Sequence, residues 1–270
     1  MAPDEAGDPT GKLTCRQCSG TYVVSEGVAT LIPLDAYRRF PIRKVQDVYD
    51  RAYGHPGIMG TQFDPEYSRV TKTALLEFCH GAPNARILDI GTGDGDLWTF
   101  TPDANNGYAI DISEVGVRRA RGRFPSLHAA VAVSEWLPYP NEFFGSVIAA
   151  DTLEHAFDLV QSLRAIKRVL AADGTLACSV PAPDSLRKWG YNRMLRGVPS
   201  LRFALRLARV VLLRAFLFGK PNFQPLDRDL SLDGWRQVLD EAGFRIVTLR
   251  EWPAPPLKPI VYLVSAKVAS

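Results

Sequence analysis

The feature that most constrains the fold is a short apolar run that ends in closely spaced glycines. Residues 85–95 read Ala-Arg-Ile-Leu-Asp-Ile-Gly-Thr-Gly-Asp-Gly. The apolar run at residues 87–90 predicts a buried strand. Gly91, Gly93 and Gly95 allow the backbone to turn sharply and to pass close to a ligand. The segment therefore predicts a strand followed by a ligand-binding loop.

Asp89, just before the glycines, narrows the class of ligand. In a dinucleotide site, a pyrophosphate would meet a helix N-terminus at this point. A carboxylate there repels a diphosphate and attracts a cationic amine. The spacing is also G-x-G-x-G and not G-x-G-x-x-G. A ligand with an adenosine end, an ammonium group and no phosphate meets these conditions, and we therefore predict that S-adenosylmethionine binds here.

Length and composition indicate one sizeable core with a small appendage. The chain has 270 residues, of which 46% are apolar and 23% charged. Arginines interrupt every apolar run, so we expect no bilayer-spanning segment. The acidic N-terminus does not resemble a secretory signal, and four cysteines are too few for a disulfide framework. We therefore expect a reduced, cytoplasmic protein.

Apolar runs alternate with helical periodicity beyond residue 80, which predicts a doubly wound, Rossmann-like α/β fold with a parallel sheet. Strands are expected at 86–90, 108–112, 128–133, 146–150, 175–180, 245–249 and 259–264. The predicted organisation is an N-terminal arm at 1–34, a helical cap at 35–80 and a main domain at 81–270. An inserted helical lid is expected at 185–226.

Three further segments follow strands and therefore reach the carboxyl edge of the sheet, where open α/β folds bind ligands. Asp111 ends the second strand, where an acid accepts hydrogen bonds from both hydroxyls of an adenosine ribose; the alternative is a helix-capping role. Residues 133–140, Val-Ser-Glu-Trp-Leu-Pro-Tyr-Pro, follow the third strand. Residues 150–155, Ala-Asp-Thr-Leu-Glu-His, follow the fourth.

The order and spacing of these segments resemble the class I S-adenosylmethionine-dependent methyltransferases. The similarity is greatest to the small-molecule branch that includes ubiquinone- and menaquinone-biosynthesis enzymes. It rests on the glycine loop, Ile110-Asp-Ile112, residues 135–140 and Leu153-Glu-His155. It also rests on residues 167–181 and on Ser231 to Phe244. The expected sheet has seven strands, of which the last runs antiparallel.

The resemblance implies a role for individual residues. Gly91, Thr92 and Gly93 would contact the methionine moiety, with Asp89 oriented toward its amino group and Asp151 on the floor beneath it. Asp111 would bind the ribose, Ile112 would pack on the adenine, and Ser134 and Glu135 would meet the adenine edge. Val133 stands where family members often have an aspartate for the adenine amino group, so that contact is either absent or supplied by Glu135.

His155 is the predicted general base for a methyl transfer to oxygen. A hydroxyl is a weak nucleophile and needs such a base, and histidine titrates near neutral pH. The alternative is a helix-capping or supporting histidine at the start of the next helix. Two other classes of function stay open: a non-catalytic protein that binds S-adenosylmethionine, and a nicotinamide-dependent oxidoreductase, which Asp89 disfavours.

Residues 185–226 contain seven Arg, two Lys and no acidic residue. Arg202, Arg206 and Arg209 recur at helical spacing among apolar residues. The pattern at 199–219 is typical of a helix at a membrane surface, with a lipid-like acceptor. It also fits recognition of an anionic small molecule, or a cap helix with a solvated arginine stripe. Nucleic acid is not expected, because few aromatic residues are interspersed.

Cys15 and Cys18 resemble the second half of a small zinc ribbon. A structural zinc ion needs four ligands, and this chain supplies one Cys-x-x-Cys pair. A degenerate ribbon without metal is therefore expected. Zinc shared between two chains and a redox-active pair are the alternatives.

Overall fold

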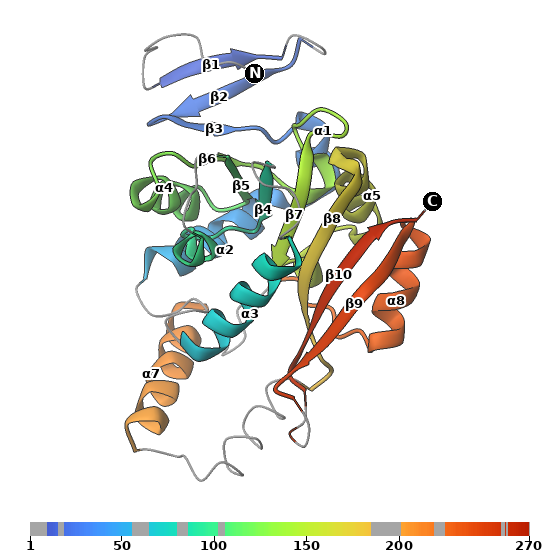
Figure 1. Cartoon of the computed structure of the whole chain (residues 1–270). Helices are drawn as coiled ribbons and strands as arrows, with labels where there is room; N and C mark the ends of the chain where they lie inside the picture. Colours follow the sequence, from blue (N-terminus) through green and yellow to red (C-terminus); the bar gives the residue numbers. More distant parts are fainter. Residues whose placement is uncertain are drawn as a thin grey trace.

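The computed structural model describes residues 10–15, 19–55, 65–79, 86–101, 106–184, 201–218, 225–254, 257 and 259–269. Its centre is one mixed sheet of ten strands in the order β1-β2-β3-β6-β5-β4-β7-β8-β10-β9 (Figure 1). The strands are β1 (Thr10–Thr14), β2 (Thr21–Ser25), β3 (Val28–Thr30), β4 (Ile87–Ile90), β5 (Gly107–Asp111), β6 (His128–Val131), β7 (Phe144–Ala150), β8 (Leu170–Pro181), β9 (Phe244–Trp252) and β10 (Val261–Val268).

The described part of the chain forms seven α-helices, four of which pack on the two faces of the sheet. The helices are α1 (Leu34–Arg39), α2 (Ile42–Gly54), α3 (Pro65–Phe78), α4 (Glu114–Arg123), α5 (Leu159–Val169), α7 (Leu201–Phe218) and α8 (Leu232–Glu241). The α3 and α4 helices pack on one face, where Leu75 and Ala120 join a buried cluster. The α5 and α8 helices pack on the other, where Leu163 and Trp235 are buried. The predicted doubly wound α/β architecture is therefore observed.

Seven of the strands form the expected arrangement. Strands β6, β5, β4, β7 and β8 are parallel, and β10 runs antiparallel to both β8 and β9. The last strand of the chain is thus antiparallel, as predicted. This order brings the carboxyl ends of β4, β5, β6 and β7 together at one edge.

The predicted total of seven strands is wrong, because the N-terminal arm adds three. Strand β3 pairs in parallel with β6, with Thr30 opposite Val131, and β1 and β2 extend the sheet further. Val28 and Ile32 are buried against Val131 and Val133. The backbone groups of β6 would otherwise lie unpaired at an edge, and an added strand satisfies them.

Local capping signals fix several helix ends. Ser113 caps α4 by accepting a hydrogen bond from the Gly116 amide, and Ser231 caps α8 by accepting one from Gly234. Gly243 has a φ of +80°, the left-handed conformation that follows a helix C-terminus. Serine before the first turn of a helix and glycine just after its end are the residue types that these two positions favour.

Candidate functional site

A cavity opens at the carboxyl edge of the sheet and is roofed by α2. Its walls come from α2, from the ends of β4, β5, β6 and β7, and from the turn that precedes α5. The lining residues are Val45, Tyr49, Tyr53, Ile90, Gly91, Ile110, Asp111, Ile112, Ala132, Val133, Ser134, Glu135, Asp151, Thr152, His155, Ala156 and Phe157. Segments far apart in the sequence therefore contribute to a single site.

The glycine loop has no space for a side chain at Gly91 or Gly93. Gly91 and Gly93 have φ angles of +74° and +55°, which residues with a Cβ rarely adopt. A Cβ on Gly91 would lie 2.3 Å from Oγ1 of Thr152, and a Cβ on Gly93 would lie 2.2 Å from the hydroxyl oxygen of Tyr53. The packing of Thr152 and Tyr53 against the loop therefore requires glycine at both positions.

Asp111 fastens this loop to the end of β5. Its carboxylate accepts hydrogen bonds from the amides of Gly93 (2.8 Å) and Ser113 (2.7 Å). Burial raises the pKa of Asp111 to about 6, while the two amides lower it. The side chain is 7% exposed and lines the cavity. Because each carboxylate oxygen accepts more than one hydrogen bond, Asp111 retains capacity for ligand hydroxyls.

Helix α2 is held over the cavity by three hydrogen bonds, which involve the side chains of Asp50 and Gln46. Asp50 accepts hydrogen bonds from the Ser113 hydroxyl (2.6 Å) and the Val115 amide (3.0 Å). Gln46 donates to the carbonyl of Ile112 at 3.0 Å. Sequence reasoning did not assign a site role to Tyr49, although the spacing of four between Val45, Tyr49 and Tyr53 places these residues on one helix face.

Asp89 lies beneath the loop and is absent from the cavity lining. The residue is 2% exposed. Burial raises the pKa of Asp89 to about 7, and the nearby Thr92, Lys72 and Trp98 lower it. Thr92 and Gly93 are likewise not among the lining residues. In this structure Asp89 therefore faces the protein interior beneath the loop.

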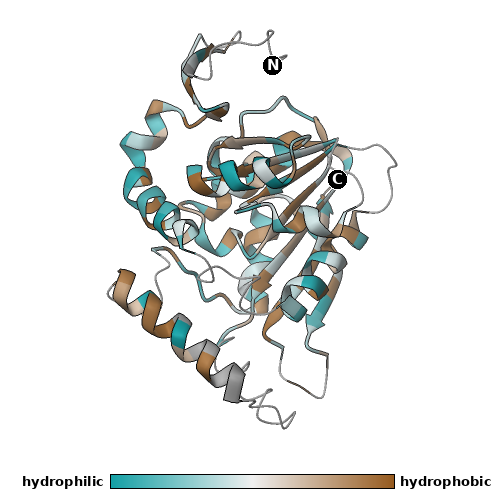
Figure 2. Ribbon diagram, turned by 90° about the vertical axis from the view of Figure 1, so that its left-hand side faces the viewer, coloured by the Kyte–Doolittle hydropathy of each residue, from teal (hydrophilic) through white to brown (hydrophobic). Residues whose placement is uncertain are grey.

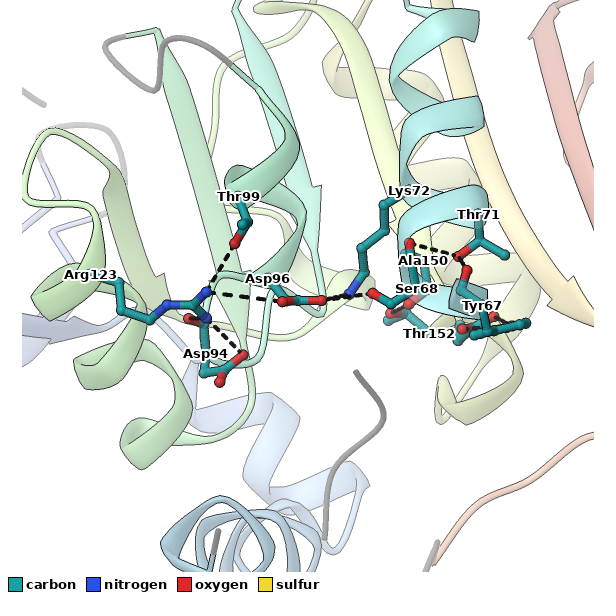
Figure 3. Close-up of polar contacts among 11 residues, drawn as sticks. Tyr67, Ser68, Thr71, Lys72, Asp94, Asp96, Thr99, Arg123, Ala150 and Thr152 are labelled. Carbon is teal, nitrogen blue, oxygen red and sulfur yellow. Dashed lines mark hydrogen bonds and ion pairs between the residues drawn. The ribbon is translucent and has the colours of Figure 1, made fainter. Parts of the chain in front are cut away.

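Residues from α3 and α4 clamp the chain just after the glycines (Figure 3). Asp96 pairs with Lys72 of α3 and accepts a hydrogen bond from Ser68 at 2.8 Å. On the other side, Arg123 of α4 donates to the Asp94 carbonyl at 2.8 Å and to the Thr99 hydroxyl at 2.9 Å. The loop is thereby fixed from both neighbouring helices.

Ser134 and Glu135 line the cavity while their side chains bind the protein. Glu135 accepts hydrogen bonds from the amides of Phe157 (2.7 Å) and Asp158 (3.1 Å), and the Ser134 hydroxyl contacts that of Ser162 at 2.9 Å. Burial raises the pKa of Glu135. The Glu135 carboxylate therefore fixes the turn before α5.

Asp151 follows β7 directly and has a left-handed conformation with φ of +50°. Tyr67 of α3 donates its hydroxyl to the two carboxylate oxygens at 2.8 and 2.9 Å. Ser179 of β8 donates to the same carboxylate at 2.8 Å. Strained conformations of this kind persist only where the surroundings hold them. Neither Tyr67 nor Ser179 carries a local sequence signal, because only the folded sheet brings them to Asp151.

His155 lines the cavity, and one nitrogen of its imidazole has a defined hydrogen-bond partner. Its Nδ1 lies 2.6 Å from the carbonyl oxygen of Leu226. A carbonyl only accepts, so the proton is assigned to Nδ1 and the lone pair to Nε2. Burial lowers the pKa of His155, which favours this neutral form. Glu154 Oε1 lies 3.8 Å from Nε2, and burial together with Asp151 raises the pKa of Glu154 well above its usual range.

The segment at residues 225–230, which follows the predicted lid, binds the backbone of the turn at residues 154–157. The Arg228 guanidinium donates to the carbonyls of Glu154 (3.3 Å) and Phe157 (2.9 Å), and also to that of Ala156. The Arg228 amide donates to the Glu154 carbonyl at 3.2 Å. These bonds hold the segment at residues 225–230 in place, and the Leu226 carbonyl within it orients His155.

The structure thus brings together seven of the ten predicted site residues as cavity-lining residues. They are Gly91, Asp111, Ile112, Ser134, Glu135, Asp151 and His155. The other three, Asp89, Thr92 and Gly93, lie in or beneath the loop behind this surface.

Within the described ranges, no group of three or more His, Cys, Asp or Glu side chains is placed to hold a metal ion. Cys18 lies outside the described residues, so the state of the Cys15–Cys18 pair, expected to be free of zinc, stays a prediction. Of the helices that the structure describes, none is both long and apolar enough to cross a membrane.

Comparison with known proteins agrees with the geometry. Residues 88–178 match the family model described as a methyltransferase domain. The chain is 30% identical over 170 residues to the malonyl-[acyl-carrier protein] O-methyltransferase of Geobacter sulfurreducens, covering 58% of this chain and 61% of that protein. It is 29% identical over 161 residues to the ubiquinone/menaquinone biosynthesis C-methyltransferase UbiE of Vibrio campbellii, covering 54% and 62%. The chain therefore spans less than two thirds of the length of these relatives.

A solved structure shares the fold. It is the 1,6-didemethyltoxoflavin-N1-methyltransferase of Burkholderia thailandensis with bound 1,6-didemethyltoxoflavin and S-adenosylhomocysteine. The similarity has a TM-score of 0.57 and 17% identity, and covers 95% of this chain and 98% of that one. The matched segment contains the glycine loop, Asp111 and His155, which lie around one cavity. Residues 88–178 of this chain are therefore similar to a methyltransferase domain, and they contain most of the residues that line the cavity.

Proposed function

We propose that the protein transfers a methyl group from S-adenosylmethionine to a hydroxyl of a small-molecule acceptor. The observation that carries the proposal is the shared cavity. Gly91, Asp111 and Ile112 line one part of it, and His155 lines another with a neutral, oriented imidazole. A donor subsite and a candidate base thus adjoin the same space.

The residues present fit the cofactor. Gly91 lines the cavity, where its backbone would contact the methionine moiety. Asp111 would offer its carboxylate to the ribose, and Ile112 would offer an apolar surface to the adenine. Because Ser134 and Glu135 bind the protein with their side chains, the backbone of this turn is the part left for the adenine edge. The cofactor supplies a methyl group that the positive charge on its sulfur already activates.

The work left to the protein is alignment and proton removal. Fixing two reactants in line lowers the barrier by several kcal/mol, and the loop clamped by Lys72 and Arg123 provides a fixed reference for that alignment. Nε2 of His155 would accept the acceptor's hydroxyl proton, while Nδ1 stays bonded to the Leu226 carbonyl. The neutral imidazole suits this role at neutral pH.

Cofactor binding is tested by isothermal titration calorimetry with S-adenosylmethionine. We expect saturable binding that Asp111→Asn weakens at least tenfold, since a hydrogen bond to a charged group contributes about 1.5–3 kcal/mol. Asp158→Asn is the control, because Asp158 caps α5 away from the cavity lining. Absence of binding, or preferential binding of a nicotinamide dinucleotide, would contradict the proposal.

The base is tested with His155→Asn, because the asparagine amide still donates to the Leu226 carbonyl but removes no proton. Hydroxyl, amine and carbon acceptors would be screened for release of S-adenosylhomocysteine, with turnover expected on hydroxyls. The substitution should lower kcat by a factor of about 10²–10⁴ and leave cofactor affinity unchanged.

The activity of the unsubstituted protein should also depend on pH. Since burial lowers the pKa of His155 from 6.5, activity should rise with pH below 6.5 and level off above it. Cofactor binding without turnover would indicate the non-catalytic alternative.

A further inference from the structure

Helix α7 exposes large apolar side chains on one face. The exposed fractions are 62% for Leu205, 68% for Leu212 and 85% for Phe216. Their spacing of seven and four places these residues along one side of the helix. Arg209 lies between them and is also exposed. We call these four residues the α7 surface. In Figure 2 the helix lies apart from the sheet, at the lower left of the molecule.

The opposite side of α7 is anchored to the protein. Leu213, Leu217 and Phe218 pack against Val48, Tyr49 and Ala52 of α2. The Arg51 guanidinium also lies 5.9 Å from the centre of the Phe218 ring. The helix therefore has a buried side of its own, and the α7 surface is a second, separate apolar side.

The charge of the surrounding segment indicates the partner. Residues 185–226 contain seven Arg, two Lys and no Asp or Glu. A partner that matches both properties is negatively charged at its surface and apolar beneath it. A small soluble anion offers no apolar depth for leucine and phenylalanine. An anionic lipid bilayer offers both, and basic amphipathic helices lie in its interface.

We propose that the α7 surface docks on an anionic lipid bilayer, with Leu205, Leu212 and Phe216 inserted among the lipids and Arg209 at the headgroups. The docked side lies opposite the contact with α2. Helix α2 contributes Tyr49 and Tyr53 to the cavity lining, so in the docked state α7 would lie between the bilayer and the helix that roofs the site. An acceptor that partitions into lipid would then be concentrated near the cavity.

Vesicle sedimentation of the full-length protein tests the proposal without a methyl donor or acceptor, so its result is independent of the proposed function. The probes are vesicles of phosphatidylcholine alone and of phosphatidylcholine with phosphatidylglycerol in equal parts. We expect binding to the anionic vesicles, weaker binding to the neutral ones, and a decline with added salt. Lack of binding to anionic vesicles, or binding that ignores both charge and salt, overturns the proposal.

A pair of double variants identifies the surface. Leu212→Ser with Phe216→Ser removes inserted apolar groups and should weaken anionic vesicle binding at least tenfold, because each buried CH₂ contributes about 0.8 kcal/mol. The control is Leu34→Ser with Val247→Ser, which alters side chains that are 76% and 56% exposed on α1 and β9. Circular dichroism should be unchanged in both. Equal loss in the two variants assigns the binding to another part of the protein and overturns the proposal.

The remaining alternative occupant is a second copy of the chain. If light scattering shows a dimer that the Leu212 and Phe216 substitutions convert to a monomer, while vesicles of either kind leave the protein in solution, the α7 surface is a dimer interface. A monomer that sediments with anionic vesicles through these residues supports the bilayer.

Discussion

The backbone at Gly91 excludes a side chain for two independent reasons. Its φ of +74° is unfavourable for residues with a Cβ, at a cost of about 1–2 kcal/mol. The space where a Cβ would lie is also filled by Thr152, with atoms as close as 2.3 Å. A small change at this single position should therefore affect both folding and the cavity.

We predict that Gly91→Ala lowers the free energy of unfolding by about 2 kcal/mol or more and weakens S-adenosylmethionine binding at least tenfold. Gly122→Ala is the matched control, since Gly122 lies in α4 with no atom within 4 Å of its added Cβ. There we expect a gain of up to about 1 kcal/mol. Urea unfolding and calorimetry measure the two effects. Equal behaviour of the two variants would show that the loop is not constrained as described.

At the scale of elements, the glycine loop is supported by two helices, α3 and α4. Helix α3 precedes the loop in sequence, yet Lys72 and Ser68 bind Asp96 just after the glycines (Figure 3). The two charged side chains are only 15% and 17% exposed. Removing one partner of such a pair leaves the other charge poorly solvated.

Lys72→Met should therefore destabilise the protein by about 3 kcal/mol and loosen the loop. Arg236→Met is the comparison, because the Arg236–Asp233 pair is 51% and 90% exposed. Pairs exposed to this degree contribute about 0–1 kcal/mol. Urea unfolding gives both values, and a difference between them of less than about 1 kcal/mol would contradict a structural role for the clamp.

The elements that sequence predicts well are those set by neighbouring residues. Ser231 caps α8 and Gly243 follows its end, because both signals act within a few residues. Alternation of apolar runs predicts the parallel strands in the same way. The polar contacts of Asp151 with Tyr67 and Ser179 depend on three elements meeting. Such contacts leave no local pattern, and for that reason these residues were not predicted.

At the scale of the whole molecule, the N-terminal arm shows the same limit. Its cysteine pair suggested a separate ribbon, whereas the described part forms three strands of the main sheet. Strand β3 joins the arm to β6, about a hundred residues later in the chain, with Thr30 opposite Val131. Periodicity reports which face of a strand is apolar but not which strand it joins. The arm is therefore part of the wall behind the cavity, where Val28 contacts the cluster that includes Val131 and Val133.

This placement predicts that the arm unfolds together with the domain. Val28→Ala should destabilise the whole protein by about 2 kcal/mol, because it leaves a cavity in a packed cluster, while Val23→Ala on the neighbouring strand should change stability by no more than about 0.5 kcal/mol. Val28 and Val23 are 2% and 59% exposed, respectively.

Hydrogen exchange then distinguishes one folding unit from two. Leu31 donates its amide to the Val131 carbonyl at 2.7 Å, so in a single unit Val28→Ala accelerates exchange in β3, β6 and β5 together. Acceleration confined to β1–β3 would mean that the arm folds by itself and that the sheet edge at β6 is stable without it.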